Sequence, residues 1–293
     1  MRLDRTLIAI RERSLLDILD LALRLVCANS VPLILCAGPF VLLAMLANEA
    51  LVGWMLADQD DPSQVVRYLW TQILLISITA PLVTAPMISY LGAAVFQEQP
   101  QAGQIARTTL RSWWPLLVYV ILWRGIALAV WLVLMIPRYG EYSGPEGWLI
   151  LLAGWCLLVR AMRPFICEII LLERNPMHAR DKQTLTIRRR SVALHGPHTG
   201  DLIARWIVTA TITVALVFAI ICTVWCAQGA LFFNWNLSSA FLRLVIPGTM
   251  WGVAVFMHVV RFLTYLDTRI RREGWEVELV VRAAGARLEG QFA

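Results

Sequence analysis

The sequence predicts an all-α protein, a polytopic integral membrane bundle of six transmembrane helices that an amphipathic interfacial helix precedes. Three observations support this fold class. Hydrophobic residues make up 59% of the 293 positions and charged residues only 16%, which is unusual for a soluble domain. Six apolar segments reach the length of about 20 residues that a spanning helix needs. Basic residues also concentrate in alternate connections between these segments.

The segment before the first apolar run has the pattern of an amphipathic helix. In RSLLDILDLALRLVCAN, apolar residues recur at helical spacing, while Arg13, Asp17, Asp20 and Arg24 line the opposite face. The charged residues form two pairs spaced four positions apart, which favours ion pairs along the helix. Because the polar face is too charged to enter hydrocarbon, we expect the helix to lie in the interface or beneath the bundle.

Six apolar segments follow and form the predicted bundle. Their predicted bounds are Val31–Leu56, Val65–Ala94, Trp113–Ile136, Trp148–Leu172, Leu202–Gln228 and Leu237–Leu266. No polar stretch is long enough to build a separate core. The sequence therefore predicts a single membrane domain over residues 1–293, with an amphipathic segment at 1–30, the bundle at 31–266 and a tail at 267–293.

The distribution of basic residues predicts the orientation. With the amino terminus in the cytoplasm, nineteen Arg and Lys residues fall in cytoplasmic segments, whereas the outside loops hold Arg67 and Arg138, with Arg243 near a span. An even number of crossings then places both termini in the cytoplasm. The charged residues that follow Tyr265 should stop the sixth helix at the cytoplasmic headgroups, with Tyr265 itself as an interfacial aromatic. The predicted location is the bacterial cytoplasmic (inner) membrane.

Arg124 is a charged residue inside the predicted third span. It follows the start of that span by about eleven residues, which at 1.5 Å per residue places it near the bilayer midplane. A charge at this depth needs a partner or water. The favoured interpretation is a structural tie to Glu49, to Asn48 or to carbonyls that a proline frees in a neighbouring helix. The other interpretation is a contact with a substrate or ion inside a cavity.

The predicted fourth span carries charges near its end. Arg160 and Arg163 precede Pro164, and Glu168 and Glu173 follow it. We expect this span to end early and continue as a bent segment, so that both arginines snorkel toward headgroups and Arg163 pairs with one of the glutamates. As a general acid and base, the two glutamates lack an accompanying nucleophile or metal ligand.

The connection between the fourth and fifth spans is a basic cytoplasmic loop. Its histidines, His178, His195 and His198, match no zinc spacing, so we expect them to be solvated. The run of three arginines that ends at Arg190 is expected to face anionic headgroups and to offer a docking surface to an acidic protein partner.

Several function classes find no support in the sequence. No Walker A loop, G-x-S-x-G elbow, H-E-x-x-H helix or kinase motif is present, and no Cys-x-x-Cys pair occurs among the six cysteines. The net charge of +6 lies between apolar spans, where it faces lipid headgroups rather than nucleic acid. We therefore expect no enzyme activity, no cofactor, no metal and no nucleic acid, with membrane lipid as a partner.

Three stretches carry a resemblance that covers most of the chain: LLDILDLALRLVCANSVPLIL, then VRAMRPFICEIILLERNP with RRRSVALHG, and finally YLDTRIRREGWEVEL. Together they resemble bacterial six-helix membrane proteins of the glycerophosphoryl diester phosphodiesterase membrane-domain family and its uncharacterised relatives. The catalytic domain that gives this family its name is absent here, and the insertion MHARDKQTLTI departs from its pattern. The resemblance implies an architecture, with motif positions at Glu173, Arg190, Ser191, Asp267, Arg269 and Glu273.

Two functional hypotheses follow from these patterns. The first is a non-enzymatic inner-membrane protein that binds or positions partner proteins or lipids, with Asp267 and Glu273 pairing with Arg190 or Arg174 on the cytoplasmic side. The second is a transporter or channel subunit for a small or lipid-like anionic solute. It rests on Arg124 and on Pro81 and Pro86, which give the second span two places to kink, because discontinuous helices often line a transport path. Pro247 gives the sixth span a place to kink as well.

Overall fold

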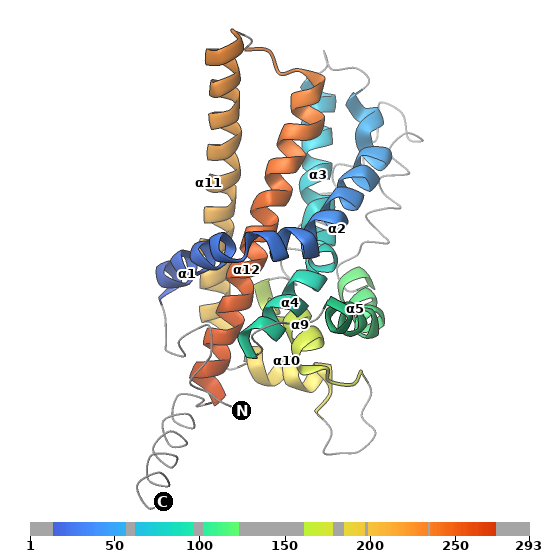
Figure 1. The fold of residues 1–293 in the computed structure, drawn as a ribbon, viewed down its shortest axis with the longest axis vertical. Helices are drawn as coiled ribbons and strands as arrows, with labels where there is room; N and C mark the ends of the chain where they lie inside the picture. The colour runs from blue at the N-terminus through green and yellow to red at the C-terminus, as the bar shows by residue number, and fades with distance from the viewer. Residues whose placement is uncertain are drawn as a thin grey trace, which may run out of the picture.

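The computed structural model describes residues 14–56, 62–96, 102–122, 161–177, 185–196, 199–233 and 235–273 (Figure 1). Every regular element in these ranges is helical, which confirms the all-α class for this part of the chain. The main helices are α1 (Leu15–Ala28), α2 (Ser30–Val52), α3 (Pro62–Val83), α4 (Ala85–Phe96), α5 (Ala102–Arg111), α6 (Trp113–Leu116), α9 (Ile166–Glu168), α10 (Ile187–His195), α11 (Thr199–Phe232) and α12 (Ile246–Glu273).

Four helical segments are long and apolar enough to cross a membrane. They are Ser30–Leu56, Pro62–Val83, Thr199–Phe232 and Phe241–Arg271, and they coincide with the first, second, fifth and sixth predicted spans. At 1.5 Å per residue, the 34 residues of α11 exceed a hydrocarbon core of about 30 Å, so this helix projects beyond the core. The third and fourth predicted spans fall largely within residues 123–160, outside the described residues, and a total of six stays a prediction.

The second predicted span is two helices rather than one. α3 ends at Val83, and α4 begins at Ala85 and leaves the line of α3 (Figure 1). The break coincides with Pro86, which has no N–H to donate to the carbonyl of Leu82 and lies in the first turn of α4, where proline is well tolerated. At the break, the hydroxyl of Thr84 donates to the carbonyl of Ala80 at 2.8 Å. The backbone carbonyl of Thr84 accepts from the N–H of Ile88 at 3.0 Å.

The last span has an irregular start and a later end than predicted. It begins with a π-helical turn, Phe241–Val245, after which the N–H of Ile246 donates to the carbonyl of Phe241, five residues earlier, just before Pro247. α12 then continues to Glu273. The charged residues therefore do not end the helix, because carboxylates and guanidinium groups from neighbouring elements pair with them along its last turns.

α1 lies across α12, roughly perpendicular to it (Figure 1). The side chains of Ile18 and Ala22 are buried in the largest core cluster, which α12 also lines, while Asp17, Asp20 and Arg24 face outward. Ser14 and Asp17 form a capping box, and Asp20 pairs with Arg24 at 3.0 Å. Ile18 and Ala22 of the predicted apolar face thus pack on the bundle, and the interfacial position of this helix stays a prediction. Arg13 lies outside the described residues.

Shorter helices, α4, α9, α10 and α5, lie to the right of the lower part of α12 in Figure 1. α9 continues into a π-helical turn, Ile169–Glu173, which contacts both α4 and α10. Residues 163–165 before α9 are not helical, as expected for a fourth span that ends early near Pro164. Phe165, Ile169 and Tyr265 share one buried cluster, so the segment 165–173 packs directly against α12.

Candidate functional site: ion-pair clusters and a cavity on α12

Glu173 accepts contacts from two helices, α10 and α12. The guanidinium of Arg190 on α10 forms a bidentate contact with the Glu173 carboxylate: Nε donates to Oε2 at 2.6 Å and Nη2 donates to Oε1 at 2.9 Å. From α12, the hydroxyl of Tyr265 donates to Oε1 at 2.7 Å, and Nε of Arg269 lies 3.7 Å from the same oxygen. We call these four residues the Glu173 cluster. Only 10% of the Glu173 side chain and 19% of the Arg190 side chain are exposed, so the bidentate pair is well shielded from water.

The α12 members of this cluster, Tyr265 and Arg269, are four residues apart and so lie on one face of the helix. Arg261, four residues before Tyr265, lies along the same face. The guanidinium of Arg269 also lies 5.9 Å from the centre of the Tyr265 ring. Tyr265 is fully buried, so the prediction of an interfacial aromatic is wrong; its ring fills the space between α12 and the segment 165–173.

Glu168 and Arg261 form an ion pair deeper in the bundle. Nε of Arg261 donates to Oε1 of Glu168 at 2.6 Å. The Glu168 side chain is 0% exposed and that of Arg261 is 10% exposed. Among the described residues, no hydrogen-bond partner reaches Glu168 Oε2 or the Arg261 Nη1 and Nη2 atoms. A carboxylate as buried as this one needs a cation nearby. That cation is Arg261, whereas the sequence predicts Arg163 as a partner for one of the two glutamates.

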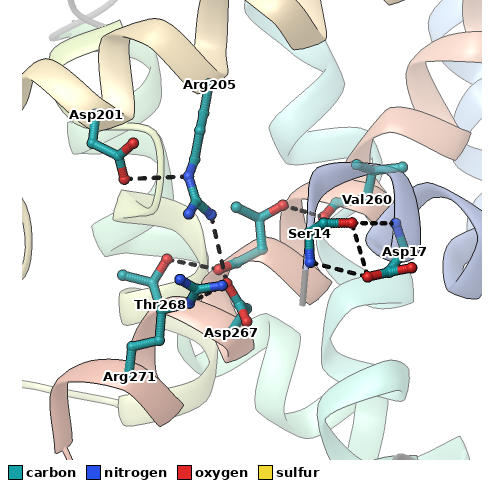
Figure 2. Close-up of polar contacts among 9 residues, drawn as sticks. Ser14, Asp17, Asp201, Arg205, Val260, Asp267, Thr268 and Arg271 are labelled. Carbon is teal, nitrogen blue, oxygen red and sulfur yellow. Dashed lines mark hydrogen bonds and ion pairs between the residues drawn. The ribbon is translucent and has the colours of Figure 1, made fainter. Parts of the chain in front are cut away.

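Asp267 joins α11 to α12 through a second cluster, which Figure 2 shows. Its Oδ2 lies 3.0 Å from Nε of Arg271, one turn further along α12, and 3.5 Å from Nη1 of Arg205 on α11. Arg205 also contacts Asp201 at 3.3 Å, so its guanidinium bridges two acids. We call these four residues the Asp267 cluster. Asp267 is buried, although the sequence places it among the headgroups.

Asp267 and Arg190 pair with partners other than those that the sequence predicts. The acid that binds Arg190 is Glu173, Asp267 pairs with Arg205 and Arg271, and Nη2 of Arg174 donates to the hydroxyl of Thr108 at 3.2 Å. The pairings proposed for Asp267 are therefore corrected. Sequence spacing cannot rank these pairs, because the packing of α10 and α11 decides which arginine reaches which acid. Glu273 is the last residue of α12, and its pairing stays a prediction.

Reversing the charge at Asp267 tests this cluster. In the Asp267→Arg variant, three cations would meet at a buried position, so we expect the melting temperature in detergent to fall by on the order of 10 °C, from about 3–5 kcal/mol for a broken buried pair. Asp201→Arg is the matched control, because Asp201 contacts the same Arg205 but is 63% exposed. Equal melting temperatures for the two variants would show that Asp267 does not hold α11 to α12.

Ser191 and His195 dock α10 on the segment 165–173. Nδ1 of His195 lies 2.7 Å from the carbonyl of Ser191, and Nε2 accepts from the N–H of Phe165 at 3.3 Å. Nδ1 therefore carries the proton of the neutral ring. The hydroxyl of Ser191 lies 3.3 Å from this protonated nitrogen, which has no lone pair to act as a base toward it. Both residues are buried, so this serine and histidine are a structural pair.

The prediction of solvated histidines is wrong for His195, because α10 folds its ring against Phe165 at a centroid distance of 5.5 Å. His178 and His198 lie outside the described residues. Within the described ranges, no group of three or more His, Cys, Asp or Glu residues is placed to hold a metal ion. Of the arginine run, Arg188 and Arg189 are exposed as expected, while Arg190 turns inward to Glu173.

A cavity of about 210 Å³ adjoins the Glu173 cluster. It lies between α4, α5, the turn Ile169–Glu173 and α12. Its apolar side includes Leu172, Phe262 and Leu266, and its polar side includes Arg174, Arg269 and Thr108. Among its described lining residues there are two arginines and no acid.

The structure thus brings five of the predicted site residues to one end of α12: Glu173, Arg190, Ser191, Asp267 and Arg269. Glu168 lies further inside, and Arg124 lies outside the described residues. Glu49, one of the partners considered for Arg124, contacts Arg243 at 3.2 Å and the hydroxyl of Tyr68 at 3.2 Å. Sequence reasoning missed Arg261 as the partner of Glu168, although a charge inside an apolar span is itself a signal that a buried partner exists.

No protein-family model matches this chain. No match appears among curated proteins or among solved structures either. The resemblance to the phosphodiesterase membrane-domain family therefore stays a prediction, and the geometry of α12 and its neighbours is the basis for the functional argument.

Proposed function

We propose that this chain is a non-enzymatic, multi-pass inner-membrane protein that binds membrane lipid in the cavity beside the Glu173 cluster. A single observation carries the proposal: apolar side chains and two arginines line the same cavity, beside the end of a helix that is long and apolar enough to cross a membrane. Lipids have the matching division into apolar chains and a polar headgroup. A non-enzymatic role also allows a partner protein to occupy the cavity. The leucine and phenylalanine side chains that line the cavity favour lipid instead.

The proposed orientation has both termini in the cytoplasm. The support is electrostatic: the end of α12 that carries the Glu173 and Asp267 clusters also carries Arg174, Arg190, Arg205, Arg269 and Arg271. Toward the opposite end of the bundle, the described residues include the ion pair of Glu49 and Arg243. Arginine-rich ends face the cytoplasm and its anionic leaflet. The cavity would then open near the headgroups of the inner leaflet.

Filling the cavity tests the proposal. Ala93 of α4 lines it, and an Ala93→Phe variant should occupy the space that a lipid would use. We expect native mass spectrometry of the purified full-length protein to show lipid adducts on the wild type and at least about tenfold fewer on this variant, because burial of a lipid's apolar surface drives retention.

The matched control is Ala106→Phe, the same change at an exposed position of α5 that is not among the described lining residues. It should retain lipid as the wild type does. If both variants retain lipid equally, or if the wild type retains none, the cavity is not a lipid site.

A transporter or channel subunit for a small or lipid-like anionic solute is the second candidate function. The buried pair of Glu168 and Arg261 favours it, because polar atoms without described partners inside a bundle often mark a hydrated path. The break at Thr84 between α3 and α4 adds a discontinuous helix of the kind that lines such paths. Transport would require Glu168 and Arg261, whereas lipid binding would require the residues that line the cavity. Variants of Glu168 and Arg261 therefore distinguish the two candidate functions.

A further inference from the structure

We infer that the cavity selects an anionic phospholipid, with the phosphate between Arg174 and Arg269 and the acyl chains against the leucine wall. This inference rests on the proposed lipid-binding function and specifies its ligand class. The first argument is charge. Two guanidinium groups and no acid among the described lining residues give the cavity a positive rim, and guanidinium groups bind phosphate oxygens with paired N–H donors.

The second argument is that both arginines are held in place before any ligand arrives. Arg174 has a left-handed backbone, with φ of 53° and ψ of 34°, which is uncommon for a residue other than glycine, and its Nη2 donates to the hydroxyl of Thr108 at 3.2 Å. Arg269 lies over the Tyr265 ring, and its Nε is 3.7 Å from Glu173. Cations that their neighbours fix in this way lose little entropy when an anion binds.

The third argument is size. At about 210 Å³ the cavity is smaller than the 300–1,000 Å³ typical of a site that encloses a drug-sized ligand. It therefore holds a headgroup and the first part of a chain, and the remainder of the chains must lie along the apolar surface. Free phosphate would satisfy the arginines but would leave Leu172, Phe262 and Leu266 unused. A phosphopeptide would bring polar backbone groups against the same leucines, at a cost in unpaired hydrogen bonds.

The test compares two lipids with identical acyl chains. The purified full-length protein, in detergent, is titrated with phosphatidylglycerol or phosphatidylcholine and read by native mass spectrometry. We expect the wild type to retain phosphatidylglycerol about tenfold more tightly than phosphatidylcholine, because one charge-assisted hydrogen bond is enough to give a difference of this size. Arg174→Gln and Arg269→Gln should each weaken phosphatidylglycerol retention more than phosphatidylcholine retention, because the choline cation already offsets the phosphate charge of phosphatidylcholine, and each variant should therefore lose most of the preference. Inorganic phosphate at the lipid concentration should not displace the bound lipid.

Arg188→Gln removes the same charge from an exposed position of α10 that is not among the described lining residues, and it should behave as the wild type. A loss with Arg188→Gln equal to that with Arg174→Gln would overturn the inference in favour of general surface charge. Displacement by inorganic phosphate would overturn it in favour of a free-anion site. Equal retention of both lipids, abolished by Ala93→Phe, would overturn the selectivity but leave the lipid-binding function standing. Retention of neither lipid would end both.

Discussion

Replacing Glu168 by leucine is expected to lower the melting temperature of the protein in detergent by on the order of 10 °C. The substitution leaves Arg261 charged and 10% exposed with its closest acceptor removed. Removal of one partner from a buried ion pair typically costs about 3–5 kcal/mol, because the remaining charge has lost its compensation. In a chain of this size each kcal/mol corresponds to roughly 2–4 °C. The measurement is a thermal unfolding curve of the full-length protein.

The double variant Glu168→Leu with Arg261→Met is the control that separates charge from packing. Two apolar side chains of similar volume leave no buried charge, so we expect most of the lost stability to return. The double-mutant cycle, with Arg261→Met as its fourth corner, should give a coupling energy at least as large as one single loss, about 3–5 kcal/mol or more. If the two single losses simply add, then Glu168 and Arg261 do not depend on one another, and the close contact between them contributes nothing to stability.

The same double variant distinguishes the two candidate functions. Neither Glu168 nor Arg261 is among the described residues that line the cavity, so lipid retention should be unaffected. A transport path through the bundle would need these polar groups, and the folded double variant would then lose anion flux in proteoliposomes. Flux in the wild type that disappears in the double variant would make transport the better explanation.

Fold class and most span positions could be predicted because they depend on properties that act residue by residue. A long apolar segment is helical in a bilayer whatever its neighbours are, since only a helix pairs its own backbone groups. Accordingly Ser30–Leu56 and Thr199–Phe232 coincide with predicted spans. From the sequence, either Pro81 or Pro86 could interrupt the second span, and the sequence alone does not favour Pro86 as the site of the break at Thr84. Local rules allow a proline either to bend a helix or to begin a new one, and tertiary packing makes the choice.

The candidate site could be predicted in its residues but not in its pairings. Charge and motif position identified Glu173, Arg190 and Asp267, which do lie together at one end of α12. Which cation meets which acid depends on how α10 and α11 pack on that helix, and sequence separation carries no such information. His195 shows the same limit: a loop composition indicates solvent, but a short helix buries this ring through a hydrogen bond to a residue thirty positions away.

Glu173→Gln should disturb this end of the protein more widely than any other conservative substitution. The side chain keeps its size but loses the charge that Arg190 and Arg269 share, and it can no longer accept with both atoms from the Arg190 fork. We expect a fall in melting temperature on the order of 10 °C, from about 3–5 kcal/mol for a broken buried pair. Asp20→Asn is the matched control, because Asp20 also pairs with an arginine but is 58% exposed, and such pairs contribute little.

A second readout follows from the position of Arg190 on α10. With Glu173 neutral, α10 loses its strongest tie to the segment 165–173, and trypsin should cleave after Arg190 faster than in the wild type. Arg269 would lose its anchor at the same time, so phosphatidylglycerol retention should weaken while the cavity stays open to both lipids. Unchanged melting and an unchanged tryptic pattern would mean that apolar packing around Phe165 and Ile169, rather than the carboxylate, docks α10 on α12.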